Sequence, residues 1–303
     1  MAVPLKALGI NSKDENEMMG LGWLHELPDI RDYSVGTEAV SMILKPLKLS
    51  KISPSTLPAA VDMKNMFSPI ENQQSIGSCT AHAGVGLVEY FERKAFGTHI
   101  DASRLFLYKV TRNLLQVAGD TGAYLRTTMA AMTLFGVPPE KYWPYDIKKY
   151  DIEPTAFLYS FAEDFEAINY FRLDPPGTTP SDLLARIKTY IAAGLPSMFG
   201  FTVYDSISQA ATTGKIPFPC AKERVLGGHA IDAVGYSDQM RIKNTVCGLE
   251  TTGAFLIRNS WGTGWGDKGY GWLPYDYVLK GLAGDWWSLL KAGWIDTGEF
   301  GLK

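Results

Sequence analysis

A single cysteine stands at the start of a predicted helix. Cys79 follows Gly77 and Ser78 and precedes the run TAHAGVGLVEYFERKAFG at 80–97. Apolar residues recur in that run at helical spacing, and it ends in basic residues and a glycine, as a capped helix does. At a helix amino terminus, unpaired N–H groups and a cationic partner can lower a thiol pKa to roughly 3.5–7.5. The position therefore suits a nucleophilic cysteine.

The partner that would favour a thiolate is a histidine, and the chain has four. His82 lies one turn along the same predicted helix as Cys79, where a histidine more often belongs to the surface or the core. His229 follows Gly227 and Gly228 and opens a predicted strand, where small neighbours leave an imidazole accessible. For His229, a structural role and a catalytic role stay equally open at this point.

An amide side chain at another strand end could orient that imidazole. Asn259 ends the predicted strand AFLIRN and is followed by Ser260, Trp261 and a glycine. Such an amide can hold a histidine in one tautomer beneath an indole ring. An asparagine before a turn is usually only a turn former, so Asn259 alone indicates little.

Three segments together resemble the signatures of papain-like cysteine peptidases. QQSIGSC, GGHAIDAVGYS and IRNSWGTGWGDKGYG occur in the family's chain order of cysteine, histidine and asparagine. The resemblance covers about residues 57–280. It implies an α+β, papain-like two-lobed fold with a helical left lobe, an antiparallel β-barrel-like right lobe and the active site between them.

The resemblance also implies a role for each signature residue. Cys79 would be the nucleophile, His229 the general base and later the acid, and Asn259 the residue that orients the imidazole. Gln73 would join the backbone N–H of the nucleophile in an oxyanion hole, where each donor is worth on the order of 3 kcal/mol. Trp261 would shield the histidine–asparagine hydrogen bond and border the substrate.

The same resemblance implies where a peptide binds. Gly122 and Ala123, in GDTGAY, would pair with the backbone of an extended substrate. Gly200, Gly228 and Ala230 would line the main side-chain pocket. Three small residues predict a roomy apolar pocket that prefers a bulky hydrophobic residue two positions before the scissile bond.

The cysteines depart from the family pattern. Ile76 stands three residues before the nucleophile where many relatives have a cysteine, and Asp120 stands where its partner is expected. Loss of both halves of one disulfide favours a real relative over a chance match, and it fits a reducing compartment. For Cys220 and Cys247, we favour two unpaired thiols over a bridge, which would clip a predicted hairpin extension at 238–253.

Periodic patterns predict a helix-rich half followed by a strand-rich half, which is typical of an α+β protein with two lobes. The predicted helices are 79–97, 103–116, 124–135 and 181–193, and the predicted strands are 196–204, 229–237, 254–262 and 269–275. We divide the chain into an N-terminal extension (1–56) and a papain-like peptidase domain (57–303). The domain comprises a helical lobe (about 57–160), a β lobe (about 161–280) and a C-terminal segment (281–303).

The sequence of the extension predicts an arm with one short helix, because turn-forming residues recur throughout residues 1–56. Residues 20–35 carry apolar side chains and a proline that favours extended backbone, so they could lie along a substrate groove. In that case the extension would be a propeptide. Packing on the outside of the lobes is an equal alternative.

Composition limits the partners. The 303 residues are 46% apolar, enough for a sizeable core, and the net charge of −3 provides no basic face for nucleic acid. No metal-ligand spacing, signal peptide or bilayer-spanning run is found. We therefore expect a cytoplasmic protein without metal or organic cofactor, and without a nucleic-acid or membrane partner, that acts on peptides or proteins.

The predicted function is that of a cysteine endopeptidase working through a Cys-His-Asn triad and a thioester acyl-enzyme, made as a zymogen if the extension inhibits. Two alternatives remain open: acyl transfer, including transpeptidation, to an acceptor other than water on the same triad, and a binding module that no longer cleaves.

Overall fold

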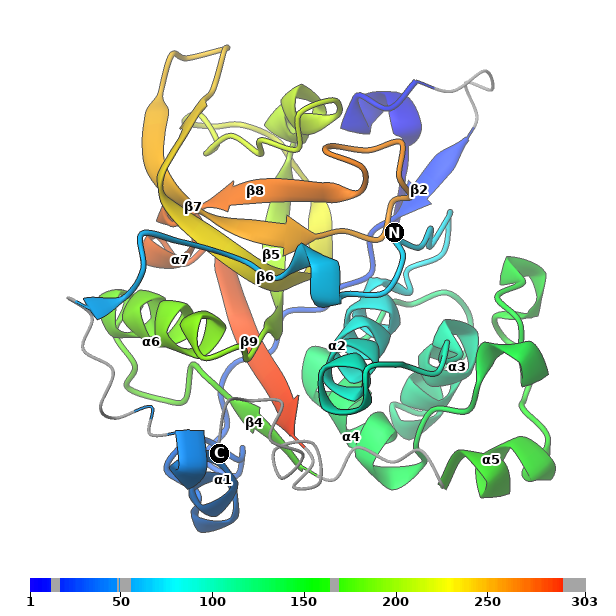
Figure 1. Ribbon diagram of the computed structural model, residues 1–303. Helices are drawn as coiled ribbons and strands as arrows, with labels where there is room; N and C mark the ends of the chain where they lie inside the picture. The colour runs from blue at the N-terminus through cyan, green and yellow to red at the C-terminus, as the bar shows by residue number, and fades with distance from the viewer. Residues whose placement is uncertain (12–16, 48, 50–55, 164–168, 291–303) are drawn as a thin grey trace.

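The computed structural model describes residues 1–11, 17–47, 49, 56–163 and 169–290. The helices within residues 79–162 gather on one side of the molecule, and the antiparallel sheet lies on the other side with further helices beside it (Figure 1). A blue N-terminal segment runs between the two sides. The predicted α+β class is confirmed. The α-helices are α1 (Glu38–Leu44), α2 (Cys79–Phe96), α3 (Arg104–Leu114), α4 (Leu125–Leu134), α5 (Ala156–Ala162), α6 (Pro180–Ala192) and α7 (Asp276–Leu279).

Short 3₁₀ turns link several of these elements. They are η1 (Leu5–Leu8), η2 (Lys45–Leu47), η5 (Lys64–Met66), η6 (Glu140–Tyr142), η7 (Ile147–Lys149) and η9 (Asp205–Ala210). The strands are β1 (Ala2–Pro4), β2 (Met18–Gly20), β3 (Ala60–Asp62), β4 (Asn169–Arg172), β5 (Ser197–Tyr204), β6 (Val225–Lys243), β7 (Glu250–Arg258), β8 (Tyr270–Pro274) and β9 (Ala283–Leu290).

Helix α2 is the centre of the helical lobe. It begins at Cys79 and ends where Gly97 takes the left-handed conformation, with φ of 73°, after two basic residues in its last turn. It is buried along most of its length, because α3 and α4 cover it on one side and β6 packs on another. In α3, the hydroxyl of Ser103 accepts the N–H of Phe106 and caps the helix.

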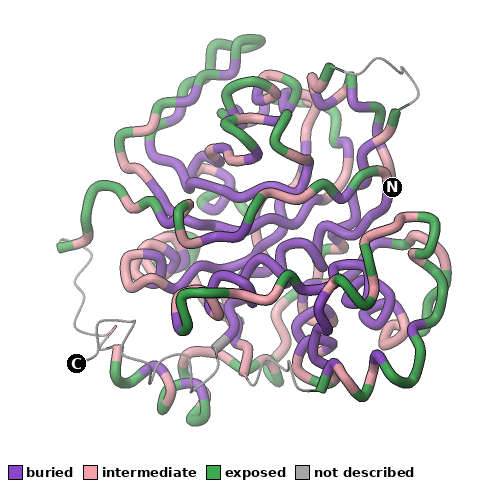
Figure 2. The backbone as a smooth tube through the Cα atoms, turned by 45° about the vertical axis from the view of Figure 1, so that its right-hand side comes forward, coloured by how far each residue is buried: buried purple, intermediate pink, exposed green. Residues whose placement is uncertain are grey.

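The main sheet has the order β4-β9-β5-β6-β7-β8, with β3 pairing to β6, and its neighbours are antiparallel. In the described part of the chain its two outer strands, β4 and β8, do not pair with each other. The lobe is therefore an open sheet, and the expectation of a barrel-like lobe is wrong in that respect. Figure 2 shows a buried core that continues through both lobes, with exposure concentrated in loops.

The N-terminal segment, which is the predicted extension of residues 1–56, is more structured than expected in its described part. Strands β1 and β2 pair with each other, and the short helix α1 lies at the opposite end of the molecule from β2 (Figure 1). The segment between them crosses the molecule. Leu8, Met19, Leu21 and Val40 are buried in the core, so this segment is part of the packed fold.

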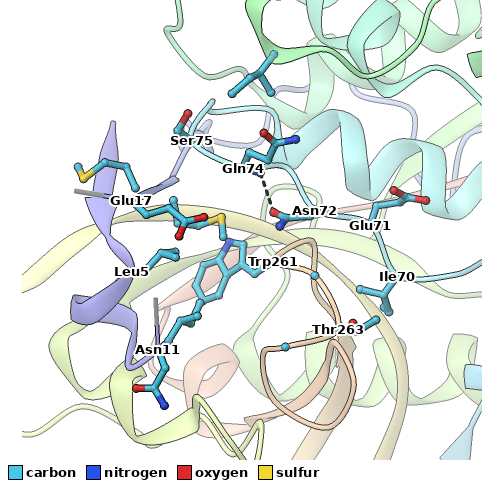
Figure 3. A pocket seen from close by; sticks show the side chains of 16 residues that line it. Leu5, Asn11, Glu17, Ile70, Glu71, Asn72, Gln74, Ser75, Trp261 and Thr263 are labelled. Atoms are coloured by element: carbon cyan, nitrogen blue, oxygen red, sulfur yellow. Dashed lines mark hydrogen bonds between the residues drawn. The ribbon is translucent and has the colours of Figure 1, made fainter. Parts of the chain in front are cut away.

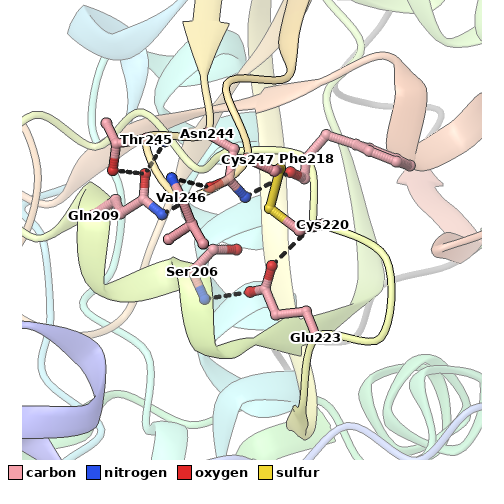
Figure 4. The surroundings of a disulfide bond; sticks show 9 residues. All are labelled: Ser206, Gln209, Phe218, Cys220, Glu223, Asn244, Thr245, Val246 and Cys247. Carbon is pink, nitrogen blue, oxygen red and sulfur yellow. Dashed lines mark hydrogen bonds between the residues drawn. A yellow bond between two sulfur atoms is a disulfide. The ribbon is translucent and has the colours of Figure 1, made fainter.

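A disulfide joins Cys220 to Cys247 (Figure 4), so the expectation of two unpaired thiols is wrong. It ties the tip of the β6–β7 hairpin to the segment before β6. Asn244 donates from its side chain to the carbonyl of Phe218, at 3.0 Å, across the same junction. Closing such a loop contributes on the order of 3 kcal/mol in the chain-entropy model.

Candidate active site

Cys79 occupies the first position of α2 and is completely buried. The backbone N–H groups of Ala230 and Gly22 lie beside its sulfur, where they favour the thiolate. Ala230 directly follows His229 in β6, so the sheet brings the predicted base beside the predicted nucleophile. Gly22, by contrast, belongs to the N-terminal segment.

His229 and Asn259 meet across two neighbouring strands. Nε2 of His229 lies 2.7 Å from Oδ1 of Asn259, which follows the end of β7. Since Oδ1 is an acceptor, Nε2 carries the proton and Nδ1 is left as the basic nitrogen. Nδ1 is buried and has no hydrogen-bond partner among the described residues. The indole of Trp261 stacks on the imidazole with centroids 4.6 Å apart.

Burial sets the protonation of both groups. It raises the pKa of Cys79 to about 11 and lowers the pKa of His229 to about 4, although hydrogen bonds oppose both shifts. The sequence predicted a lowered thiol pKa from the helix amino terminus. The difference arises because the desolvation of the completely buried sulfur outweighs the N–H groups that favour a thiolate. At neutral pH this form therefore holds an uncharged thiol and an uncharged imidazole.

Gln73 lies beside the same helix start. Its Nε2 donates to the carbonyl of Ile76 at 3.1 Å and to that of Gly20 at 3.0 Å, and its Oε1 accepts the hydroxyl of Ser260 at 2.6 Å. The side chain is therefore fixed in orientation. The amide that would face an oxyanion faces instead a carbonyl of the N-terminal segment.

The predicted peptide-binding backbone is already paired. The N–H of Ala123 donates to the carbonyl of Gly22 at 2.8 Å, and the N–H of Leu24 donates back to Ala123 at 3.0 Å. On the opposite wall, the N–H of Trp23 donates to the carbonyl of Gly228 at 3.1 Å. Residues 20–24 thus lie as an extended strand between the two lobes. This agrees with the possibility, raised by the sequence, that residues 20–35 lie along a substrate groove.

The side chain of Trp23 fills a slot between the predicted pocket residues. A Cβ on Gly200 would stand 1.9 Å from Cε2 of the indole, and one on Gly228 would stand 2.8 Å from Cε3. Only glycine leaves room at these two positions. The indole N–H donates a hydrogen bond to Oδ2 of Asp285 at 3.2 Å.

The sequence pattern of the papain family cysteine proteases matches residues 57–279. This chain belongs to that family. It is a papain-family cysteine peptidase, a hydrolase of peptide bonds, and its two-lobed α+β fold is the papain-like fold.

Relatives of this peptidase span distant organisms. An uncharacterised peptidase-like protein of Acanthamoeba polyphaga mimivirus is 32% identical over 280 residues, covering 88% of this chain and 86% of its own. Cathepsin K of Gallus gallus is 30% identical and covers 71% of this chain and 58% of its own. Among solved structures, the cysteine protease xylellain from Xylella fastidiosa aligns with a TM-score of 0.71 at 29% identity, covering 92% of this chain and 98% of its own. Since residues 57–279 alone are too few to supply that coverage, the likeness extends beyond them.

Hydrogen bonds of Asp120 link the segments that a disulfide joins in many members of the family. Oδ1 of Asp120 accepts the N–H of Gly77 at 2.8 Å and the hydroxyl of Tyr108 at 2.5 Å. The N–H of Gly122 donates in turn to that hydroxyl at 3.1 Å. The carboxylate thereby links the loop before Cys79 to α3 and to the Gly-rich loop.

Replacing Asp120 with alanine should loosen this link. Two donors would lose their acceptor, so we expect the free energy of unfolding in urea to fall by about 1–3 kcal/mol. Asp120→Asn is the matched control, because an amide oxygen can still accept both donors, and it should recover most of the loss. An alanine variant with wild-type stability would show that the link contributes nothing.

Two arginines, which carried no recognisable signal in the sequence, hold the N-terminal segment in place. Arg126 of α4 pairs with Glu26 and, at 2.6 Å, with Asp32. Arg172 of β4 lies 3.4 Å from Asp32, and its backbone N–H donates to the carbonyl of Tyr33 at 2.7 Å. Asp32 and Arg172 are almost completely buried, so these contacts anchor the segment beyond the slot.

A hollow of about 860 Å³ lies beside Trp261 (Figure 3). Leu5 and Glu17, from the N-terminal segment, lie to one side of the indole in this view, and Ile70 lies to the other. Trp265 supports the indole edge-on at 5.4 Å and is itself buried, as expected of a packing residue.

The other histidine near Cys79 takes no part in this arrangement. Nδ1 of His82 lies 3.1 Å from the carbonyl of Ser78, and its ring meets Tyr145 edge-on. Among the described residues, no group of acidic, histidine and cysteine side chains suits a metal ion, and no helix is long and apolar enough to cross a bilayer.

Proposed function

We propose that Cys79, His229, Asn259 and Gln73 carry out peptide-bond hydrolysis in this peptidase. The observation that supports this most is the 2.7 Å bond between Nε2 of His229 and Oδ1 of Asn259. It fixes the imidazole with a basic Nδ1, and His229 precedes Ala230, whose backbone N–H lies beside the Cys79 sulfur.

In this mechanism the thiol proton of Cys79 passes to Nδ1 of His229, and the sulfur attacks the substrate carbonyl carbon. The developing oxyanion accepts the backbone N–H of Cys79 and the Nε2–H of Gln73. The amine leaves with the proton from His229, which leaves a thioester. Water then attacks the thioester with the imidazole as base, and the acid product leaves.

The N-terminal segment would hold the enzyme latent. The group that it presents to the sulfur is the N–H of Gly22, which cannot be attacked, and the carbonyl of Gly20 takes the donor of Gln73. We therefore assign residues 1–56 to an inhibitory extension and 57–303 to the peptidase domain. The trimming site expected near residues 50–57 falls largely at 50–55, outside the described residues.

Release of the extension would uncover the places where substrate residues bind on both sides of the scissile bond. The slot of Trp23 would take the side chain two positions before it, and the hollow beside Trp261 would take residues that follow it. The disulfide between Cys220 and Cys247 favours an oxidising compartment over the expected cytoplasmic location.

The proposal is tested with short fluorogenic peptide amides, assayed with and without an added amine such as a glycine amide. Release of the free acid supports hydrolysis by the proposed residues. Products joined to the amine in place of the acid would make the protein an acyltransferase. No turnover even after the extension is loosened would leave it a binding module.

A further inference from the structure

We propose that Asp285 selects substrates with a neutral aromatic hydrogen-bond donor, tryptophan above all, two positions before the scissile bond. This inference rests on the proposed function, and it concerns a residue beyond the stretch that matches the family. It corrects the sequence expectation of a roomy apolar pocket, because a carboxylate lies at the end of the slot that Trp23 fills.

The carboxylate of Asp285 is buried, and its two oxygens have different partners. Oδ1 accepts the indole N–H of Trp287 at 2.7 Å and lies 3.2 Å from Nη1 of Arg172. Oδ2 accepts the indole N–H of Trp23 at 3.2 Å. Oδ1 is therefore satisfied by the permanent fold, whereas Oδ2 is satisfied by the segment that must leave.

The backbone holds Asp285 in an uncommon conformation. Its φ of 62° is left-handed, which a non-glycine residue adopts only at a cost. Asp174 compensates by accepting the N–H of Asp285 at 2.8 Å and that of Trp286 at 3.1 Å. This arrangement fixes the direction of the carboxylate toward the slot.

When the segment leaves, a substrate side chain takes the place of the indole. Oδ2 would then lie at the end of a narrow slot between Gly200 and Gly228, away from bulk water. A buried acceptor left without a donor is costly, and sites built to bind an N–H group reject analogues that lack it. A flat ring with an N–H at its far edge satisfies both the shape and the acceptor.

The charge of the slot favours a neutral donor over lysine or arginine. Departure of the segment removes Glu26 and Asp32. The acids that stay, Asp174 and Asp285, face Arg172 on β4, and Arg126 on α4 loses its two partners. Two carboxylates and two guanidinium groups balance, so no net negative charge remains to attract a cation.

The test uses the full chain carrying Trp23→Ala, which empties the slot. Two peptide amides differ only in the residue two positions before the scissile bond. One carries tryptophan there and the other carries benzothienylalanine, in which sulfur replaces the indole N–H. We expect kcat/KM to favour tryptophan at least tenfold, and to favour it over an arginine peptide as well. Equal rates for the isosteric pair, or a preference for arginine, would overturn the proposal.

Asp285→Asn in the same background sharpens the result. Because Oδ1 faces two donors, the amide oxygen should take that side and the amide N–H₂ should face the slot. The preference for tryptophan over benzothienylalanine should then fall to threefold or less. Asp238→Asn, in β6 and in the same background, is the matched control and should keep the ratio of the Trp23→Ala chain. An unchanged ratio in the Asp285 variant would assign the preference elsewhere.

Peptidyl diazomethyl ketones with the same two side chains give a readout that needs no turnover, because they alkylate a cysteine beside a bound peptide. The rate at which mass spectrometry detects labelled Cys79 should show the same tenfold ratio. Equal labelling rates would refute the role of Asp285 and leave the proposed nucleophile standing. Failure of every substrate and label refutes Cys79 as nucleophile, and this inference with it.

Discussion

Cys79→Ala should reduce hydrolysis of peptide amides by roughly 10⁴-fold or more, because the thiol forms the covalent bond on which the proposed reaction depends. The substitution removes one small buried atom and should leave the fold intact. The measurement is kcat with a fluorogenic substrate, with circular dichroism as a check on folding. More than trace activity in a clean preparation would remove Cys79 as the nucleophile.

The partners of Cys79 provide an internal control for this result. His229→Ala should approach the severity of Cys79→Ala, since it removes the base. Asn259→Ala should be milder, because it removes only the group that orients the ring. If the two substitutions were equally mild, the triad would be wrongly assigned.

Trp23→Ala should activate the full-length chain. The substitution empties the slot between Gly200 and Gly228 and removes the hydrogen bond to Asp285, and truncating a buried tryptophan costs about 3–5 kcal/mol of packing. Part of that loss would shift the segment toward an open state. We expect at least about a tenfold rise in peptide hydrolysis, measured against the wild-type chain.

Alkylation of Cys79 by iodoacetamide reports the same opening without a substrate. In the wild-type chain burial raises the pKa of Cys79 to about 11, so labelling should be slow at pH 7 and rise toward alkaline pH as the thiolate forms. Trp23→Ala should label faster at pH 7. Ile30→Ala, on an exposed part of the same segment, is the control and should label like wild type. Equal activity and labelling in all three chains would show that the segment does not inhibit.

Deleting residues 1–56 is a harsher version of this experiment. Leu8, Met19 and Val40 are buried, so the deletion would expose core surface as well as the groove. A single substitution in the slot separates inhibition from folding, which the deletion cannot do.

Much of this architecture was predictable from local pattern. The helix that begins at Cys79 and ends at Gly97 was placed correctly, because its apolar spacing and its capping glycine lie in one stretch of sequence. Strands β5 to β8 were predicted for the same reason, from short apolar runs between glycines. Strand β9 was missed, because AGDWWSLL has no clean alternation and contains the left-handed Asp285.

Contacts between distant segments were not predictable. Nothing near Trp23 in the sequence marks Asp285, which lies 262 residues further along, as its partner. Arg126 and Arg172 likewise had no signal, since their partners lie in the N-terminal segment. The disulfide was misjudged because the absence of a recognised secretion signal was taken as a guide to redox state, whereas pairing depends on how the hairpin folds.

The attachment of the loop before Cys79 has a consequence for redox chemistry. Asp120 fastens that loop through hydrogen bonds, and Cys79 is left with no second thiol in the chain, since the other two cysteines are paired. Oxidation would therefore take Cys79 to a sulfenic acid or a mixed disulfide with a small thiol, both of which are reversible. A reductant that restores the nucleophile would leave its loop fastened and could open only the bridge at the hairpin tip.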